Sequence, residues 1–181
     1  MRVTKTLMTW STFPEWRHIS SSVSTIKRKA LAYITHNSRL LVFRHPHHPE
    51  AGIQVPAGTI RDGESPEDAV MREAEEETGL AALALVSFLG EETRDMQPWG
   101  IDQVHHRFFY HLACGGNPPD TWQHCESDPS DGTPHPILLE LFWADLPDGI
   151  PELSGDQGSM LPALLREYGP RLRKKVDIES V

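Results

Sequence analysis

Residues 58–80 of the chain read GTIRDGESPEDAVMREAEEETGL, and they predict a helix with well-marked ends. Ser65 is a residue type favoured at the N-cap, and Pro66 suits the first helical position. Gly79 supplies the stop, because glycine readily adopts the left-handed conformation that closes a helix. We therefore expect a helix over residues 66–78.

Four glutamates crowd the second half of this helix. Glu73 lies three residues before Glu76 and four before Glu77, so these three carboxylates share one helix face, whereas Glu75 is expected on the surface. Like charges at these spacings destabilise a helix by about 0.2–0.5 kcal/mol per pair. Two interpretations remain open: a solvated acidic face, or a site for a hard divalent cation that removes the repulsion.

The whole segment resembles the signature of a known enzyme family. Every fixed position of the Nudix box is matched at the family's spacing by Gly58, Glu64, Arg72, Glu73, Ala74, Glu76, Glu77, Gly79 and Leu80. The resemblance to the Nudix hydrolase superfamily implies an α/β protein, with a Nudix-like α/β/α sandwich around a central mixed β-sheet. It also implies hydrolysis of a phosphoanhydride bond in a nucleoside diphosphate linked to another moiety, with Mg²⁺, or alternatively Mn²⁺, as cofactor.

The resemblance also assigns roles to residues of the box. Glu73, Glu76 and Glu77 are the implied metal ligands, and the backbone carbonyl of Gly58 often joins them. Arg72 completes the implied catalytic set by orienting these carboxylates. Such support is common around metal sites, where outer partners fix the ligands in place.

Two further roles depend on positions around that set. Glu64 is implied as the ion-pair partner of Arg72, and Gly79 as the structural end of the helix. The general base that takes a proton from the attacking water is left open between Glu76 inside the box and Glu126 or Glu140 beyond it.

The substrate is less well indicated than the reaction. Trp99, Phe109 and Trp122 are candidates to stack on a base, although packing is the more ordinary role for each, and His105 and His106 are expected in packing or substrate contacts. A nucleotide or nucleotide sugar is the implied substrate. The alternatives are a non-catalytic Nudix-like nucleotide-sensing or regulatory module and an RNA 5′-end pyrophosphohydrolase; the complete set of glutamates favours an enzyme.

The rest of the chain predicts strands and a second helix around the box. Apolar runs predict strands over 30–35, 39–43, 81–89, 102–112 and 137–144, and a helix over 159–168. The strand at 102–112 has aromatic residues on both faces, so it is expected to be covered on both sides. Residues 114–136 are rich in Gly, Pro, Asp and Ser and are expected to form a long loop. We divide the chain into a leader (1–28), a Nudix domain (29–169) and a tail (170–181).

Composition limits the partners. The 181-residue chain has 17 basic and 26 acidic side chains, a net charge of −9, which argues against membranes and against nucleic acid other than an RNA 5′ end. Cys114 and Cys125 are too few for a disulfide framework, and neither a signal peptide nor a membrane span is recognised, so the cytoplasm is expected. His45, His47 and His48 lie among prolines and are expected in a surface or substrate-proximal loop rather than a metal site. The expected partner is a small-molecule nucleotide, and the resemblance is compatible with a homodimer.

Overall fold

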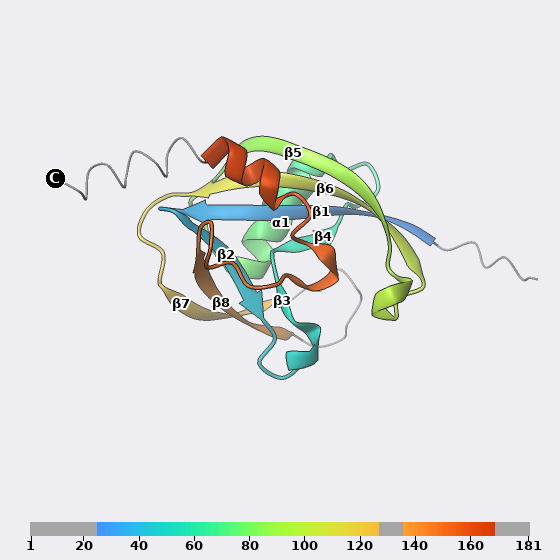
Figure 1. Ribbon diagram of the computed structural model, residues 1–181, viewed down its shortest axis with the longest axis horizontal. Helices are drawn as coiled ribbons and strands as arrows, with labels where there is room; N and C mark the ends of the chain where they lie inside the picture. Colours follow the sequence, from blue (N-terminus) through green and yellow to red (C-terminus); the bar gives the residue numbers. More distant parts are fainter. Residues whose placement is uncertain (1–24, 127–135, 169–181) are drawn as a thin grey trace, which may run out of the picture.

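The computed structural model describes residues 25–126 and 136–168. Within them, one mixed sheet has the strand order β5-β6-β1-β2-β8-β7, with β3 paired to β2 and β4 paired to β1 (Figure 1). The strands are β1 (Thr25–His36), β2 (Arg39–Arg44), β3 (Ile53–Gln54), β4 (Ala57–Thr59), β5 (Leu83–Asp95), β6 (Gln103–Cys114), β7 (Thr121–Glu126) and β8 (Ile137–Asp145). Short 3-10 turns η1 (Pro49–Ala51), η2 (Gln97–Trp99) and η3 (Ser154–Asp156) lie at the connections.

The sheet divides into two halves at β1 and β2. These strands pair only beside their turn, at Thr35–Leu40 and His36–Arg39, and then separate (Figure 1). Strand β4 continues alongside β1, and β3 continues alongside β2. The separation leaves room between the halves, and a cavity, called the main cavity below, is lined there by residues of all four strands.

Helix α1 (Pro66–Thr78) covers one face of the sheet, and its ends are those expected from the sequence. The Ser65 hydroxyl accepts the Asp68 N–H at 3.1 Å, which satisfies one of the free amides at the start of the helix. Gly79 closes the helix with φ of 70°. The apolar side of α1 (Ala69, Val70 and Ala74) packs into a core with sheet residues such as Ile34, Tyr110 and Leu141.

The opposite face is covered by a second helix over residues 161–168. Its Leu164 and Tyr168 are buried against Leu31, Tyr33 and Phe109 of the sheet. The sheet therefore has a core on each side, and the expected α/β/α sandwich is confirmed. Strand β6 contributes Tyr110 to one core and Phe109 to the other, so it is covered on both faces as expected.

Two expectations about the chain's layout are wrong. Residues 114–136 were expected to form one loop, but β7 runs through them and pairs with β8 from Thr121–Phe142 to Glu126–Ile137. Its alternate residues are polar, so the strand depends on this pairing rather than on an apolar run. The domain boundary expected at residue 29 falls inside β1, because Thr25 already pairs with Gln103 of β6 through the backbone.

Smaller differences concern the ends of elements. The second helix begins at 161 rather than 159, and β5 extends to Asp95 rather than ending at 89. The remainder of the expected leader, the expected tail and residues 127–135 lie outside the described residues.

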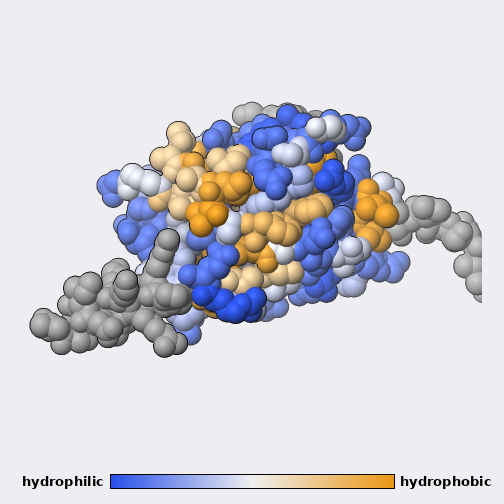
Figure 2. All heavy atoms as spheres, turned by 90° about the horizontal axis from the view of Figure 1, so that it is seen from above, coloured by the Kyte–Doolittle hydropathy of each residue, from blue (hydrophilic) through white to orange (hydrophobic). Residues whose placement is uncertain are grey.

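The surface is mixed in character. Polar and apolar side chains alternate in patches on the face shown in Figure 2. Among the described residues, the large exposed apolar side chains are on β1, on β5, and at the connection between β5 and β6: Ile26, Leu85, Val86, Phe88, Trp99 and Ile101. Of the two free cysteines, Cys114 is buried and Cys125 exposed. The part of the chain that the structure describes contains no helix long and apolar enough to cross a membrane.

Candidate active site

Glu73 lies directly against the backbone of Gly58. A Cβ at position 58 would stand 1.8 Å from the carboxyl carbon of Glu73 and 2.0 and 2.1 Å from its two oxygens. Helix α1 supplies the carboxylate, and β4 is held in place by its pairing with β1. Glu73 is only 2% exposed, and burial raises its pKa above the ordinary value. The glycine therefore makes room for a carboxylate that is costly to bury.

Arg72 links three carboxylates. Its guanidinium donates to the two oxygens of Glu64 at 2.8 and 2.9 Å, so the ion pair expected between these residues is present. The remaining nitrogen donates to Glu73 at 2.7 Å and to Glu76 at 3.1 Å. The hydrogen bonds from Arg72 lower the pKa of Glu64 to about 2. Arg72 thus fixes the orientation of Glu64 and Glu73 and partly balances the charge of the cluster.

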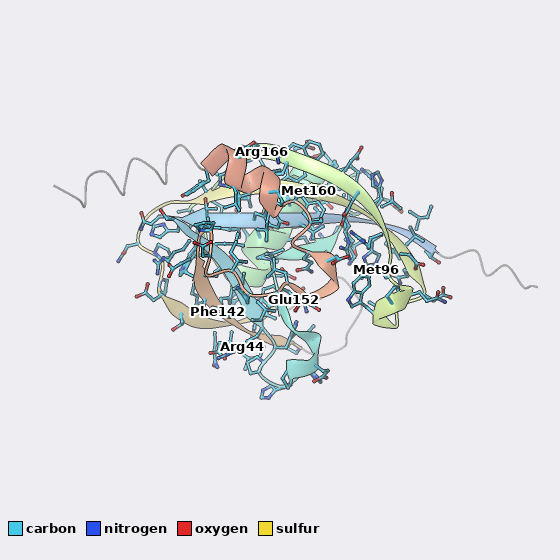
Figure 3. The ribbon with its side chains drawn as sticks, viewed as in Figure 1. Arg44, Met96, Phe142, Glu152, Met160 and Arg166 are labelled. Carbon is cyan, nitrogen blue, oxygen red and sulfur yellow. The ribbon has the colours of Figure 1, made fainter. Side chains whose placement is uncertain are left out.

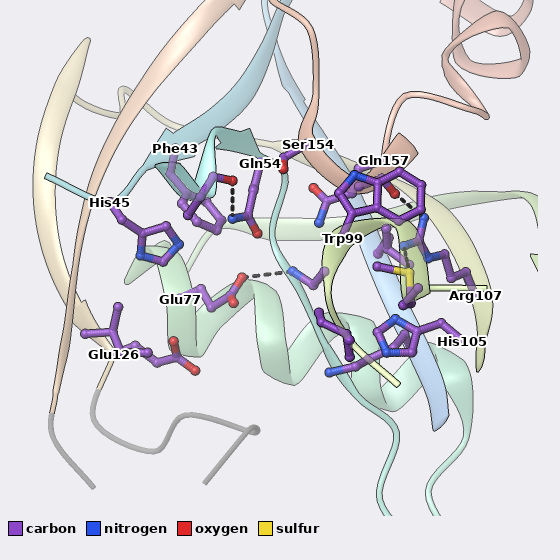
Figure 4. A pocket seen from close by; sticks show the side chains of 18 of the residues that line it. Phe43, His45, Gln54, Glu77, Trp99, His105, Arg107, Glu126, Ser154 and Gln157 are labelled. Carbon is purple, nitrogen blue, oxygen red and sulfur yellow. Dashed lines mark hydrogen bonds between the residues drawn. The ribbon is translucent and has the colours of Figure 1, made fainter. Parts of the chain in front are cut away.

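Glu77 is buried one helical turn further along. Its Oε2 accepts the N–H of Ala57 at 2.9 Å, and its side chain lines the main cavity. Burial raises the pKa of Glu77 well above its ordinary value, and the charge of Glu126 raises it further. Glu126 is the last residue of β7, is 6% exposed and lines the same cavity. Two buried carboxylates from different elements therefore face one space (Figure 4).

The cavity has a volume of about 470 Å³ and two chemically different ends. Glu77, Glu126 and His45 lie at one end (Figure 4). Trp99, His105 and Arg107 lie at the other, beside the 3-10 turn η2. Such a volume is within the range usual for small-molecule sites.

Lys29 brings positive charge to the same cavity. Its ammonium group donates to the Thr59 hydroxyl at 2.8 Å. The charge of Lys29 lowers the pKa values of Glu73 and Glu77, although burial outweighs it in both. This lysine lies on β1 and is one of the residues that line the cavity.

The donor set suits a hard divalent cation. Glu73, Glu77 and Glu126 are buried carboxylates, and carboxylate and carbonyl oxygens are the ligands that Mg²⁺ prefers. Burial raises the pKa of Glu73 and of Glu77, and a nearby cation would oppose this. Within residues 25–126 and 136–168, no three His, Cys, Asp or Glu side chains converge closely enough to hold an ion as they stand. Arg72 supplies the neutralising charge between Glu73 and Glu76 instead.

Not every predicted carboxylate lines the cavity. Glu76 is at the rim of the cluster, bonded to Arg72 with Arg61 at 3.9 Å. Glu140 forms two hydrogen bonds with Arg44 and does not line the cavity. Figure 3 shows Arg44 near Phe142, on the side of the sheet far from Met96. Of the two carboxylates proposed beyond the box, Glu126 alone faces Glu77.

Of the aromatic and histidine candidates for substrate contacts, some line the cavity and others do not. Trp99 lines the cavity, Phe109 is fully buried in the core, and the Trp122 indole donates to the carbonyl of Thr78. His105 lines the cavity, whereas His106 lies 3.0 Å from Glu91 at the surface.

The three loop histidines also divide. His45 lines the cavity, whereas His47 and His48 are exposed, and His48 lies 3.2 Å from Glu50.

The sequence does not single out Lys29, Arg107 or Gln157 as cavity residues. These come from β1, β6 and the segment after η3, and only the folded sheet brings them together. Arg107 could have been suspected, since an arginine within the otherwise aromatic strand β6 requires a polar partner. It donates to the Gly155 carbonyl at 2.6 Å.

Buried carboxylates set against Gly58 of strand β4, on an α/β/α sandwich, indicate a hydrolase of the Nudix type. The family model described as the NUDIX domain matches residues 25–163, so the chain belongs to the Nudix family and is a Nudix hydrolase. Enzymes of this family generally use divalent metal cations.

Solved structures agree with this fold. A UDP-X diphosphatase is 17% identical with a TM-score of 0.59, over 85% of this chain and 68% of its own. The MutT Nudix hydrolase of Burkholderia pseudomallei is 26% identical with a TM-score of 0.53, and the match covers 77% of this chain and 98% of that one. An ADP-ribose pyrophosphatase of Streptococcus suis is 17% identical with a TM-score of 0.53, over 78% and 91%.

Proposed function

We propose that the protein is a Mg²⁺-dependent pyrophosphohydrolase that cleaves a phosphoanhydride bond in a nucleoside diphosphate linked to another moiety. The observation that carries this proposal is the cavity in which Glu77 of the box faces Glu126 across a space of small-molecule size. A non-catalytic sensing module would have no need to bury both carboxylates beside one another at an energetic cost.

The proposal gives each residue of the box a physical task. Glu73, Glu76 and Glu77, with the carbonyl of Gly58, would hold the cation, which when bound supplies charge against the phosphates and a more acidic water. Arg72 and Glu64 keep Glu73 oriented through the hydrogen bonds described above.

Lys29 would contribute a fixed positive charge toward the phosphates. Placing such charges before the reaction is a main source of catalysis in phosphoryl transfer.

Glu126 is the carboxylate we propose as general base. It is buried, lines the cavity and comes from outside the box, so it stands opposite Glu77 rather than beside it on the helix. In the proposed step, the oxygen of a water attacks phosphorus and one of its protons passes to Glu126. The bridging P–O bond breaks, and its electron pair leaves with the oxygen of the departing phosphate. Glu76, which is held by Arg72 at the rim, is the alternative base.

The substrate class we propose is a nucleotide or nucleotide sugar. The UDP-X diphosphatase and the ADP-ribose pyrophosphatase share the fold, and both are named for substrates of this general class. A cavity of about 470 Å³ suits a small molecule. The net charge of −9 opposes a long nucleic-acid substrate.

A substrate panel tests this function. Purified protein is incubated with ADP-ribose, UDP-glucose, nucleoside triphosphates, dinucleoside polyphosphates and triphosphorylated RNA, with millimolar Mg²⁺ or with a chelator. We expect metal-dependent release of a nucleoside monophosphate from at least one small molecule, and isotopically labelled water then identifies the phosphorus attacked. Absence of turnover on every compound would contradict the proposal, and turnover of the RNA alone would replace it.

A further inference from the structure

The cavity end away from Glu126 has no task in the hydrolysis proposed above. It is formed by Trp99 on the turn η2, by His105 and Arg107 on β6, and by Gln157 after η3 (Figure 4). Its chemistry differs from that of the carboxylate end, so it is suited to a different part of the substrate.

The Gln157 amide has a fixed orientation. Its Oε1 accepts the N–H of buried Val55 at 2.8 Å, and its backbone carbonyl accepts the hydroxyl of Tyr33 at 2.5 Å. An N–H can bond only to an acceptor, so the oxygen of the amide faces Val55 and the NH₂ group points the other way. Among the described residues, that NH₂ group has no hydrogen-bond partner. Gln157 therefore presents a donor to the cavity in a set direction.

Trp99 provides an apolar wall at the same end. Its side chain lines the cavity and remains 40% exposed, and Ile101 next to it is 41% exposed. The backbone of the turn is fixed by the Trp99 N–H, which bonds to the Met96 carbonyl at 3.0 Å. A planar ligand that covers the indole would bury apolar area on both partners, which is favourable.

The two basic residues of this end, Arg107 and His105, are not available to phosphate. Arg107 is 3% exposed, and its guanidinium already donates to the Gly155 carbonyl and to the sulfur of Met96. It therefore holds η3 against the connection that carries Trp99. His105 is neutral at physiological pH, because burial and the nearby cations lower its pKa to about 4. Arg107 and His105 therefore contribute hydrogen-bonding groups to this end but do not bind phosphate there.

We propose that this end binds the base of the substrate nucleotide, with the ring stacked on Trp99 and a ring-nitrogen or carbonyl acceptor of the base bonded to Nε2 of Gln157. The inference rests on the proposed function, which places the phosphates at the end of Glu77 and Glu126. Trp99 and Gln157 are then the residues that select a nucleotide over other diphosphates.

Binding of two matched ligands tests the proposal independently of turnover. The probes are α,β-methylene-ADP and methylenediphosphonate, which share the phosphonate group and differ in the nucleoside. Affinities are measured by calorimetry with Mg²⁺ for the wild type, Trp99→Ala and Gln157→Glu. The glutamate keeps an acceptor for Val55 and removes the donor.

We expect each substitution to weaken the binding of α,β-methylene-ADP by about tenfold or more, the order of a lost base-stacking contact. The affinity for methylenediphosphonate should be unchanged. Trp99→Phe keeps a stacking surface and should retain most of the affinity. It also provides a test if Trp99→Ala does not fold. Phe88→Ala, which removes another exposed aromatic, and Gln123→Glu, which makes the same charge change on β7, are the controls.

If the substitutions weakened the binding of both ligands equally, or of neither, the assignment of the base site would be overturned. A wild type that binds both ligands equally would overturn it as well. Failure of the hydrolytic function would show separately, as a wild type that turns over nothing in the substrate panel.

Discussion

The carboxyl group of Glu73 occupies the space that any side chain at position 58 would need, because a Cβ there would stand 1.8 Å from its carboxyl carbon. The contact joins strand β4 to the acidic face of α1. It gives a structural reason for the glycine that opens the box and the arginine–glutamate pair that follows.

Gly58→Ala should displace Glu73 and reduce kcat by about a hundredfold, the order expected when a catalytic group moves by about 1 Å. Gly115→Ala is the matched control, since its Cβ would meet atoms of Ala82 at ordinary distances of 3.6 and 3.8 Å. Steady-state kinetics and thermal melts on both variants check this. Full activity in Gly58→Ala would show that the position of Glu73 is not needed for the reaction.

Glu77→Gln should abolish turnover and yet stabilise the metal-free protein at high pH. The pKa of Glu77 is raised well above its ordinary value of 4.5 in the folded protein. The folded state therefore loses stability as the pH rises from about 4.5 to the folded-state pKa. The glutamine keeps an acceptor for the Ala57 N–H and carries no charge. Melts of the chelated protein between about pH 5 and pH 8 should therefore decline more steeply for the wild type than for the variant.

Mg²⁺ should remove the stability disadvantage of the wild type relative to Glu77→Gln at high pH. At about 100 times the dissociation constant, a ligand that binds only the folded state adds about 2.7 kcal/mol of stability. The gain in Tm should be larger near pH 8 than near pH 5 for the wild type and absent in Glu77→Gln. Glu75→Gln, at an exposed position of the same helix, should behave as the wild type does. An equal Mg²⁺ effect in Glu77→Gln would remove Glu77 from the proposed ligands.

Glu126→Gln should lower kcat by a factor of about 10²–10⁴, the usual contribution of a general base. Glu140→Gln on the neighbouring strand should leave kcat unchanged, because its carboxylate pairs with Arg44 outside the cavity. The comparison is made with the best substrate of the panel at saturating Mg²⁺. If Glu126→Gln kept normal turnover while Glu76→Gln lost it, the base would be Glu76.

Glu64→Gln should weaken the fold at neutral pH and flatten its response to acid. The pKa of Glu64 is lowered from 4.5 to about 2 by Arg72, so the ion pair contributes fully above about pH 4.5 and its contribution is lost as pH falls toward 2. Urea unfolding at several pH values should show a shallower acid dependence in the variant. Asp62→Asn, an exposed change in the same loop, should keep the wild-type slope.

The acidic helix and its support were predictable because their signals are local. Ser65, Pro66 and Gly79 determine the ends of α1 by backbone hydrogen bonding and conformation within a few residues. The spacing of Glu73, Glu76 and Glu77 on one helix face follows from the helical repeat itself. The apolar runs likewise indicated most strands of the sheet.

What the sequence by itself determined is therefore the box helix, its cluster of carboxylates and the layered class of fold. The tertiary structure decided which distant residues share the cavity: Glu126 reaches Glu77 only because β7 pairs with β8, and Gln157 reaches Trp99 only because Arg107 holds η3 in place. The physical reason is that these positions depend on contacts between separate elements: the backbone pairing of β7 with β8, and the hydrogen bond from the Arg107 side chain to the Gly155 carbonyl. Such pairing leaves no periodic pattern in a short polar strand.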